Sequence, residues 1–145
     1  MAITFIPVDE HVDTFSIYKE YMKPWIDNLF GWDESFQLTG FKTHLRQPNF
    51  SWIVIKGIKV GIICLDDENK HQKLSLLIIF KEYQRQGYSL LVLKDLINTL
   101  PDGQTLTWNS LKNNLPAVTL YSKIKTVERS ESEYFYHYRI TTKSL

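Results

Sequence analysis

The sequence predicts an α/β (α+β) fold, with a mixed, mostly antiparallel central sheet of about seven strands flanked by about four helices. Two observations predict it. The apolar residues recur at helical spacing in the N-terminal third and at strand spacing from Trp52 onward. The C-terminal half then alternates strand and helix patterns. An antiparallel meander followed by such units implies one mixed sheet with helices on both faces.

The N-terminal third is predicted to contain one strand and two helices. Residues 3–8 form the strand, and Asp9 is placed to cap a helix that runs to about residue 22. We expect Pro24 to interrupt this helix, because an internal proline loses a hydrogen bond, and to open a short second turn through residue 29. Asp33 is placed to cap the next helix, through about residue 45.

The middle of the chain is predicted to be a three-stranded meander. Residues 52–56 and 58–65 alternate in polarity around Lys56-Gly57, a tight hairpin turn. A charged turn over residues 66–70 leads to the strand at residues 73–80. That strand is apolar on both faces in its second half, as expected of a central strand.

The C-terminal part is predicted to alternate helices and strands. Leu90, Leu93, Ile97 and Leu100 mark an amphipathic helix, and residues 105–109 a strand. The helix at residues 115–123 has Pro116 in its first turn, where proline is tolerated. The final strands, residues 125–130 and 133–141, form a hairpin.

The length, net charge and cysteine content of the chain narrow the class of protein. A chain of 145 residues without a linker or repeat fits a single domain, residues 1–145. Its net charge of +1 argues against a duplex nucleic-acid partner, which needs many cations. The longest apolar run is too short to cross a membrane, and we see no signal peptide. With one cysteine, Cys64, we expect a cytoplasmic protein.

The chemical motifs are few. The four histidines are too scattered for a metal signature, so we expect no metal. One segment stands out: a central strand runs through Gln84 to Ser89 directly into a helix. The free N–H groups and positive dipole of a helix N-terminus suit a phosphate, and Gly87 allows close approach. An ordinary strand–helix turn is the alternative.

These residues resemble a known family. Gln84-x-x-Gly87-x-Ser89 is similar to the acyl-CoA signature Gln/Arg-x-x-Gly-x-Gly/Ala of the Gcn5-related N-acetyltransferase (GNAT) superfamily. Asn114 and Tyr121, seven residues apart on a later helix, resemble its second signature. The predicted order of elements is also the GNAT order. Ile124-Lys125-Thr126 departs from the family's usual Gly-Phe pair.

The resemblance implies an acetyl-CoA site. The pantetheine arm would lie between splayed strands, residues 74–80 and 105–109, and the pyrophosphate on the amides that follow. A backbone amide near Ile79 would polarise the acyl carbonyl. The cofactor-binding residues it implies are Leu77, Ile79, Gln84, Arg85, Gln86, Gly87, Tyr88, Ser89 and Asn114.

The resemblance also implies the reaction: an acetyl group moves to a primary amine by direct attack in a ternary complex. Tyr121 is the implied donor to the departing thiolate, since a tyrosine with an ordinary pKa of about 10 is protonated at neutral pH; local packing is its alternative role. For the base, the candidates that remain open are His71, Ser75, Asp33, Glu34 and Glu68, and solvent.

The acceptor stays open between a small molecule and a peptide. In the resemblance, the connection with Trp25, Phe30 and Trp32 borders the acceptor site, and an aromatic wall near the carboxylates of Asp33 and Glu34 suits a cationic amine; a hydrophobic staple between helices is the alternative. A catalytically silent acyl-CoA-binding or interaction module on the same fold is the rival function, and a purely structural domain is a third.

A homodimer that pairs through the strand at residues 133–141 is the oligomeric state that the sequence suggests.

Overall fold

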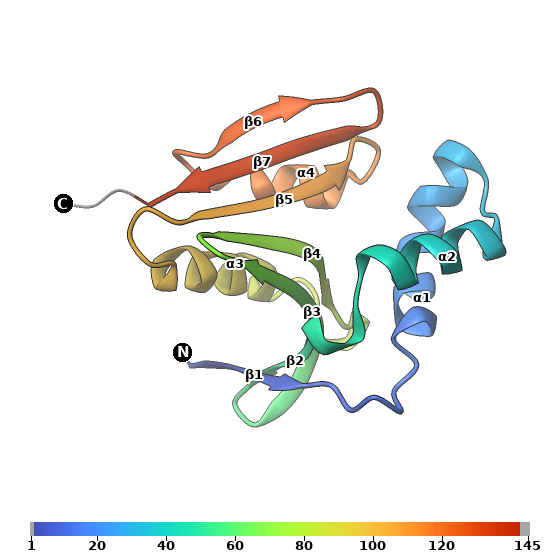
Figure 1. The fold of residues 1–145 in the computed structure, drawn as a ribbon, viewed down its shortest axis with the longest axis horizontal. Helices are drawn as coiled ribbons and strands as arrows, with labels where there is room; N and C mark the ends of the chain where they lie inside the picture. Colours follow the sequence, from blue (N-terminus) through green and yellow to red (C-terminus); the bar gives the residue numbers. More distant parts are fainter. Residues whose placement is uncertain (1, 143–145) are drawn as a thin grey trace.

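The computed structural model describes residues 2–142, which fold into one seven-stranded sheet with helices on both faces (Figure 1). The strands lie in the order β1-β2-β3-β4-β5-β7-β6. Among the strand pairs of these residues, only β4 and β5 run parallel. The elements are β1 (Ile3–Pro7), α1 (Thr14–Phe30), α2 (Glu34–His44), η1 (Gln47–Asn49), β2 (Phe50–Ile55), β3 (Ile58–Glu68), β4 (His71–Ile79), η2 (Lys81–Tyr83), α3 (Tyr88–Thr99), β5 (Thr105–Leu111), α4 (Leu115–Tyr121), β6 (Glu128–Glu131) and β7 (Phe135–Thr141). The predicted fold class and order of elements are confirmed.

The prediction for the first helix was wrong at both ends. The N-cap is Asp13, not Asp9, because the Asp13 carboxylate accepts from both the backbone N and the Oγ of Ser16, at 3.1 and 2.6 Å. These bonds lower the pKa of Asp13. Pro24 does not interrupt the helix, which continues to Phe30. Apolar side chains on both sides of Pro24, among them the buried Ile26, hold the helix against the rest of the fold.

Two hydrophobic clusters, one on each face of the sheet, form the core. The helices α3 and α4 supply Val92, Leu93 and Tyr121 to the larger cluster. The helices α1 and α2 cover the other face, where Phe41 packs with Phe50 and neighbouring strand residues. Figure 1 accordingly shows α1 and α2 together and apart from α3 and α4. The sheet is therefore buried on both faces at its centre.

The last strand lies inside the sheet. β7 pairs with β5 on one side and with β6 on the other, so its backbone groups are already used. An interior strand cannot add a second copy of the chain, and the expectation of pairing through residues 133–141 is wrong on this point. The exposed edges are β1 and β6.

Candidate active site

The parallel strands β4 and β5 pair over only part of their length. The register runs from His71–Thr105 to Leu74–Trp108 and ends there. The rest of β4 stays paired with β3 on its other side, while the rest of β5 stays paired with β7. The two halves of the sheet therefore part in the middle, beginning at Leu74. The predicted splay exists, but most of residues 105–109 lie in the paired part.

A β-bulge lies where the strands part. Against β3, Cys64 faces Leu76 and the next residue, Leu65, faces Leu74, so Ser75 is an extra residue in β4. The core shows the same shift, because Leu74, Leu77 and Ile79 all pack toward the α3 face although a regular strand alternates every residue. Leu76 and Ile78 pack on the opposite face.

The register with β3 decides where the backbone of β4 points beyond the bulge. The Phe80 N–H donates to the Val60 carbonyl of β3 at 2.8 Å. Because hydrogen-bond direction alternates along a strand, the N–H and C=O of Leu77 and Ile79 point the other way, into the opening beside β5. The Ile79 carbonyl there accepts from Nε2 of Gln84 at 2.9 Å. Main-chain groups at the opening thus match an extended ligand that binds like an added strand.

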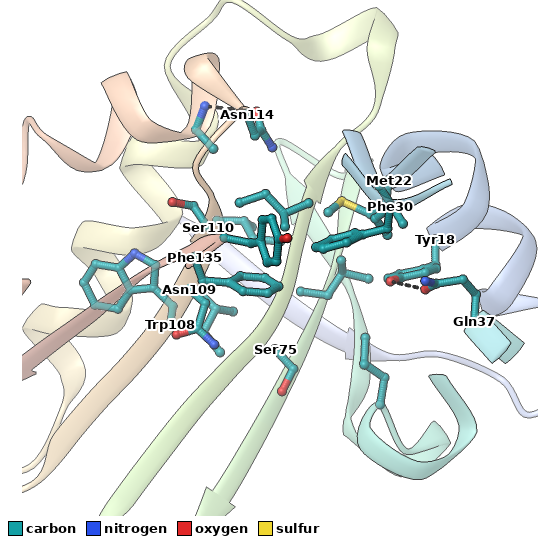
Figure 2. Close-up of a pocket in the computed structure, with 18 of the residues that line it drawn as sticks. Tyr18, Met22, Phe30, Gln37, Ser75, Trp108, Asn109, Ser110, Asn114 and Phe135 are labelled. Carbon is teal, nitrogen blue, oxygen red and sulfur yellow. Dashed lines mark hydrogen bonds between the residues drawn. The ribbon is translucent and has the colours of Figure 1, made fainter. Parts of the chain in front are cut away.

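A cavity of about 770 Å³ fills the opening and continues toward α1 and α2 (Figure 2). Its wall is mostly apolar and comes from both halves of the sheet and from the first two helices. It is lined by Tyr18, Met22, Ile26, Phe30, Gly31, Asp33, Phe36, Gln37, Leu45, Leu74, Ser75, Leu76, Leu77, Trp108, Asn109, Ser110, Leu111, Asn114, Ala117, Tyr121, Tyr134 and Phe135. The volume suits a small-molecule site.

The loop after β4 leads into the N-terminus of α3. Arg85 and Gly87 both have positive φ, 65° and 79°, and Gly87 is the N-cap of α3. A Cβ added at Gly87 would meet no described atom within 4 Å. A hydrogen bond fixes the start of the loop to α1, because the Lys81 N–H donates to the Tyr21 hydroxyl at 2.9 Å. A fixed, open loop at a helix N-terminus can bind an anion through its amides.

Asn114 and Tyr121 both line the cavity from α4. Asn114 is the N-cap of that helix, and its Oδ1 accepts from the Ala117 N–H at 3.3 Å. Tyr121 is buried and packs edge-on against Trp108 and Tyr138. Burial, with Tyr138 nearby, raises the pKa of Tyr121 to about 12. The expectation of an ordinary tyrosine pKa was wrong, because the ring is a core residue as well as part of the cavity wall.

A polar chain reaches the cavity from β7 and was missed by sequence reasoning. Asn109 lines the cavity beyond the last β4–β5 pair, and its Oδ1 lies 2.8 Å from Nδ1 of His137. The other ring nitrogen lies 2.9 Å from Oγ of Ser132. Because an amide oxygen only accepts, Nδ1 carries the proton, and the Asn109 amide is held with Nδ2 free to donate. No local motif signals this, since the three residues meet only through strand pairing.

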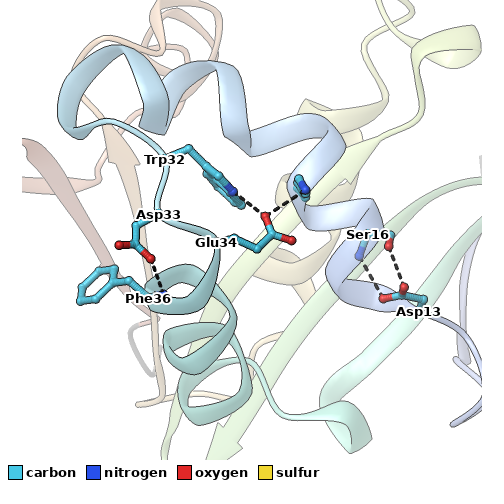
Figure 3. A network of polar contacts seen from close by, with 7 residues as sticks. Asp13, Ser16, Trp32, Asp33, Glu34 and Phe36 are labelled. Carbon is cyan, nitrogen blue, oxygen red and sulfur yellow. Dashed lines mark hydrogen bonds and ion pairs between the residues drawn. The ribbon is translucent and has the colours of Figure 1, made fainter.

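The end of α1 and its connection to α2 place two predicted acceptor residues, Phe30 and Asp33, in the cavity lining and leave Trp25 and Trp32 outside it. Asp33 lines the cavity and caps α2 by accepting from the Phe36 N–H at 2.9 Å (Figure 3). Trp32 packs against Phe15 and Tyr18 instead. Trp25 contributes its backbone carbonyl, which accepts from Nδ2 of Asn113 at 3.0 Å. The aromatic lining comes from Phe30, Phe36, Tyr134 and Phe135.

Glu34 belongs to the same connection but not to the cavity lining. Its Oε1 accepts from Nε1 of Trp32 at 2.7 Å and lies 2.9 Å from the Lys19 ammonium (Figure 3). The bond from Trp32 and the pair with Lys19 lower the pKa of Glu34. Its carboxylate therefore stabilises the connection between the two helices.

Of the described residues that are candidates for a base, Asp33 and Ser75 line the cavity, and Asp33 also caps α2. Both ring nitrogens of His71 lie near threonine hydroxyls of β5, 2.6 Å from Thr105 and 3.2 Å from Thr107. Glu68 lies opposite His71 at the paired end of the strands, away from the opening. The described residues thus assign no side chain as the base.

Cys64 is buried in β3, and burial with Asp66 nearby raises the pKa of its thiol to about 12. A thiol held protonated in this way is a poor nucleophile.

Among residues 2–142, no cluster of three or more His, Cys, Asp or Glu side chains could hold a metal ion. Within the same residues, no helix is long and apolar enough to cross a membrane.

The architecture is that of the GNAT N-acetyltransferases, as the sequence predicted. An acetyltransferase from Thermus thermophilus superposes with a TM-score of 0.66 at 15% identity, over 97% of each chain. The PaiA N-acetyltransferase from Thermoplasma acidophilum, solved in complex with coenzyme A, gives 0.62 at 13% identity over 99% of this chain and 100% of that one. The N-acetyltransferase PseH from Campylobacter jejuni, in complex with acetyl-CoA, gives 0.56 at 16% identity over 97% and 99%.

These likenesses concern the fold. No protein-family profile matches the chain, and no curated protein matches its sequence. The three solved structures are acetyltransferases, two of them bound to coenzyme A or acetyl-CoA.

Proposed function

We propose that the protein is an acetyl-CoA-dependent N-acetyltransferase that moves an acetyl group to a primary amine. The observation that carries this proposal is the opening between β4 and β5. Main-chain groups of Leu77 and Ile79 point into it, and the Gly87 loop lies at the end of the same strand. A long ligand with an amide-rich arm and a pyrophosphate matches the two features together.

Different residues bind the pantetheine arm and the pyrophosphate of acetyl-CoA in this proposal. Leu77 and Ile79 offer backbone groups to the pantetheine amides, and the Asn114 side chain lies on the facing wall. The amides of Arg85, Gln86, Gly87, Tyr88 and Ser89 surround the start of α3 and take the pyrophosphate, while Gln84 fixes the loop to Ile79. The guanidinium of the exposed Arg85 adds positive charge.

The proposed transfer balances without a covalent enzyme intermediate. The neutral amine attacks the thioester carbonyl carbon, a C–N bond forms, and the C–S bond breaks to release coenzyme A as its thiolate. The Ile79 N–H stabilises the negative charge that develops on the carbonyl oxygen. The amine loses one proton to solvent, and the thiolate finally gains one from solvent, because the described side chains assign no base.

Tyr121 donates a hydrogen bond to the departing sulfur in this scheme. A thiol has an ordinary pKa of about 8.5, well below the Tyr121 pKa of about 12, so full proton transfer from the phenol would be unfavourable. A hydrogen bond needs no such transfer and still stabilises the thiolate. Tyr121→Phe should therefore lower kcat and leave the affinity for acetyl-CoA nearly unchanged.

The test is calorimetric titration of the protein with acetyl-CoA, with two glycine variants. Gly87→Trp should abolish micromolar binding, because a bulky side chain would occupy the space where the pyrophosphate approaches. Gly103→Trp is the matched control, since Gly103 also has positive φ, 80°, with open space around it, but follows the other end of α3. No binding by the wild type would overturn the proposal, and equal loss in both variants would show a folding effect.

A second function has one observation in its favour. Among the described residues that line the cavity, Asp33 is the only charged one, and it already caps α2 by accepting from the Phe36 N–H, so a dedicated base is not evident. A module that binds acyl-CoA without transferring the acyl group would need none. Acetyl-CoA binding without any acetylated product from a broad amine panel would favour this module.

A further inference from the structure

The cavity extends beyond the opening between β4 and β5, and the wall of this further part is mostly apolar. This part faces α1 and α2, on the opposite side of the opening from α4. Its apolar lining from these two helices and the segment after them is Tyr18, Met22, Ile26, Phe30, Phe36 and Leu45. The second substrate of the proposed reaction must bind against this wall.

Exposed aromatic rings rim the mouth of this part. The exposed fractions are 49% for Phe30, 73% for Phe36 and 38% for Tyr134. Large apolar side chains that stay exposed around a cavity mark a surface that a ligand can cover. An apolar ligand that covers the rings removes their surface from water and is stabilised by that burial.

The charges at the wall favour one kind of ligand. Of the 22 described residues that line the cavity, Asp33 alone is charged, and none is Lys, Arg or His. One of its carboxylate oxygens accepts from Phe36, and the residue is exposed at the wall. A cationic amine is attracted by this charge, whereas a carboxylate or phosphate on the ligand would be repelled by it and would meet no cationic side chain in the lining.

Two contacts join α1 to the C-terminal half and limit the size of the ligand. Phe30 packs edge-on against Tyr134 of the β6–β7 turn, with ring centroids 4.7 Å apart. Nδ2 of Asn113, before α4, donates to the Trp25 carbonyl and lies 3.2 Å from Oδ1 of Asn28. A polypeptide would need an uninterrupted groove between these elements, so the bridges favour a small molecule.

Building on the proposed acetyl transfer, we infer that the acceptor is a small primary amine with an alkyl or aromatic body and no acidic group. Its apolar body lies against Met22 and Phe30, and Asp33 attracts its ammonium before the amine is deprotonated. An amino acid brings a carboxylate for which the lining has no cationic partner, and an amino sugar brings hydroxyl groups to a part of the wall that is mostly apolar.

The experiment compares acceptors in matched pairs. Phenylethylamine and phenylalanine differ only by the carboxylate, and hexylamine and 2-(2-aminoethoxy)ethanol differ in the polarity of arms of nearly equal length. Acetylated product is measured by mass spectrometry. We expect the first member of each pair to have the higher kcat/KM, on the order of 100-fold for the first pair, because the carboxylate meets the charge of Asp33 and no cationic side chain.

Variants of the cavity wall test whether Asp33 and Met22 cause the preference among acceptors. Asp33→Asn keeps the helix cap but removes the charge, and should raise KM for phenylethylamine about tenfold with little change in kcat. Met22→Gln should raise KM for hexylamine more than for the ether amine. The matched control is Glu20→Gln, which removes an exposed carboxylate of α1 outside the cavity lining and should change neither KM.

A second readout separates this inference from the proposed function. The chain has two methionines, so 13C-methyl labelling gives two signals, and Met22→Gln assigns one. Phenylethylamine should shift the Met22 signal in the protein alone, and phenylalanine should not. This result would stand even if acetyl-CoA did not bind, whereas no Met22 shift with either ligand would overturn the acceptor inference. Equal turnover within the pairs, or preference for a peptide with an apolar N-terminus, would also overturn it and leave acetyl transfer intact.

Discussion

Nε2 of Gln84 donates a hydrogen bond to the carbonyl oxygen of Ile79, 2.9 Å away. The bond closes the loop between β4 and α3 on itself, so the strand that faces the opening and the loop proposed to bind phosphate hold a fixed relative position. Two parts of the candidate site that are five residues apart thus depend on one side-chain amide.

Replacing Gln84 tests this dependence. Gln84→Leu should lower the free energy of unfolding by about 1 kcal/mol and weaken acetyl-CoA binding, because the donor to Ile79 is lost and the loop loosens. Gln84→Arg keeps N–H donors and should restore most of the affinity. Titration calorimetry and urea unfolding measure the two effects, and unchanged binding by the leucine variant would contradict the prediction.

Asn114 should have two separable roles. Its Oδ1 caps α4, and its amide faces the cavity. Asn114→Ala should cost about 1 kcal/mol of stability, as loss of a helix cap does, and also weaken acetyl-CoA binding. Asn114→Asp keeps the cap but has no N–H to donate, so it should weaken binding at nearly full stability. If the aspartate variant bound acetyl-CoA as the wild type does, the amide would have no role in binding.

The raised pKa of Tyr121 predicts an alkaline loss of stability. The folded protein holds the phenol proton up to about pH 12, whereas an unfolded chain releases it near pH 10. Stability from this group is therefore complete below pH 10 and falls as the pH rises toward 12, by about 1.4 kcal/mol at pH 11. Urea unfolding at pH 9 and pH 11 should show this loss in the wild type in excess of that in Tyr121→Phe; equal losses would contradict it.

Gly61 should be the glycine least tolerant of a side chain. A Cβ there would lie 2.2 Å from the backbone oxygen of Ile78, and main-chain atoms of the paired strand cannot move aside cheaply. Gly61→Ala should cost more than about 2 kcal/mol of unfolding free energy. Gly40→Ala in α2 is the matched control, since its Cβ meets no described atom and the change should stabilise the helix by about 0.5–1 kcal/mol. Thermal unfolding of the two variants should shift in opposite directions.

The sequence allowed the order of elements to be predicted because each change of period is local. The hairpin at Lys56 and Gly57, both with positive φ, and the cap at Asp33 follow from nearby residues alone. The error at Pro24 has a tertiary cause, since packing around Ile26 outweighs the missing hydrogen bond.

The candidate site could be predicted only where it follows from one short segment. The loop of Gln84 to Ser89 is such a segment. The bulge at Ser75 was not predicted, because it appears only when β4 is aligned with β3. The link from Asn109 to His137 depends in the same way on strand pairing. The burial that raises the Tyr121 pKa also comes from packing across the sheet.

The bulge makes the candidate site sensitive to chain length in β4 more than to side-chain identity. Deleting Ser75 would remove the extra residue and with it the local bend at the point where β4 parts from β5. Substitutions at the same positions leave the main-chain groups where they are. Sequences can therefore diverge widely along this strand during evolution while insertions and deletions are selected against, a constraint that comparison of residue types alone does not detect.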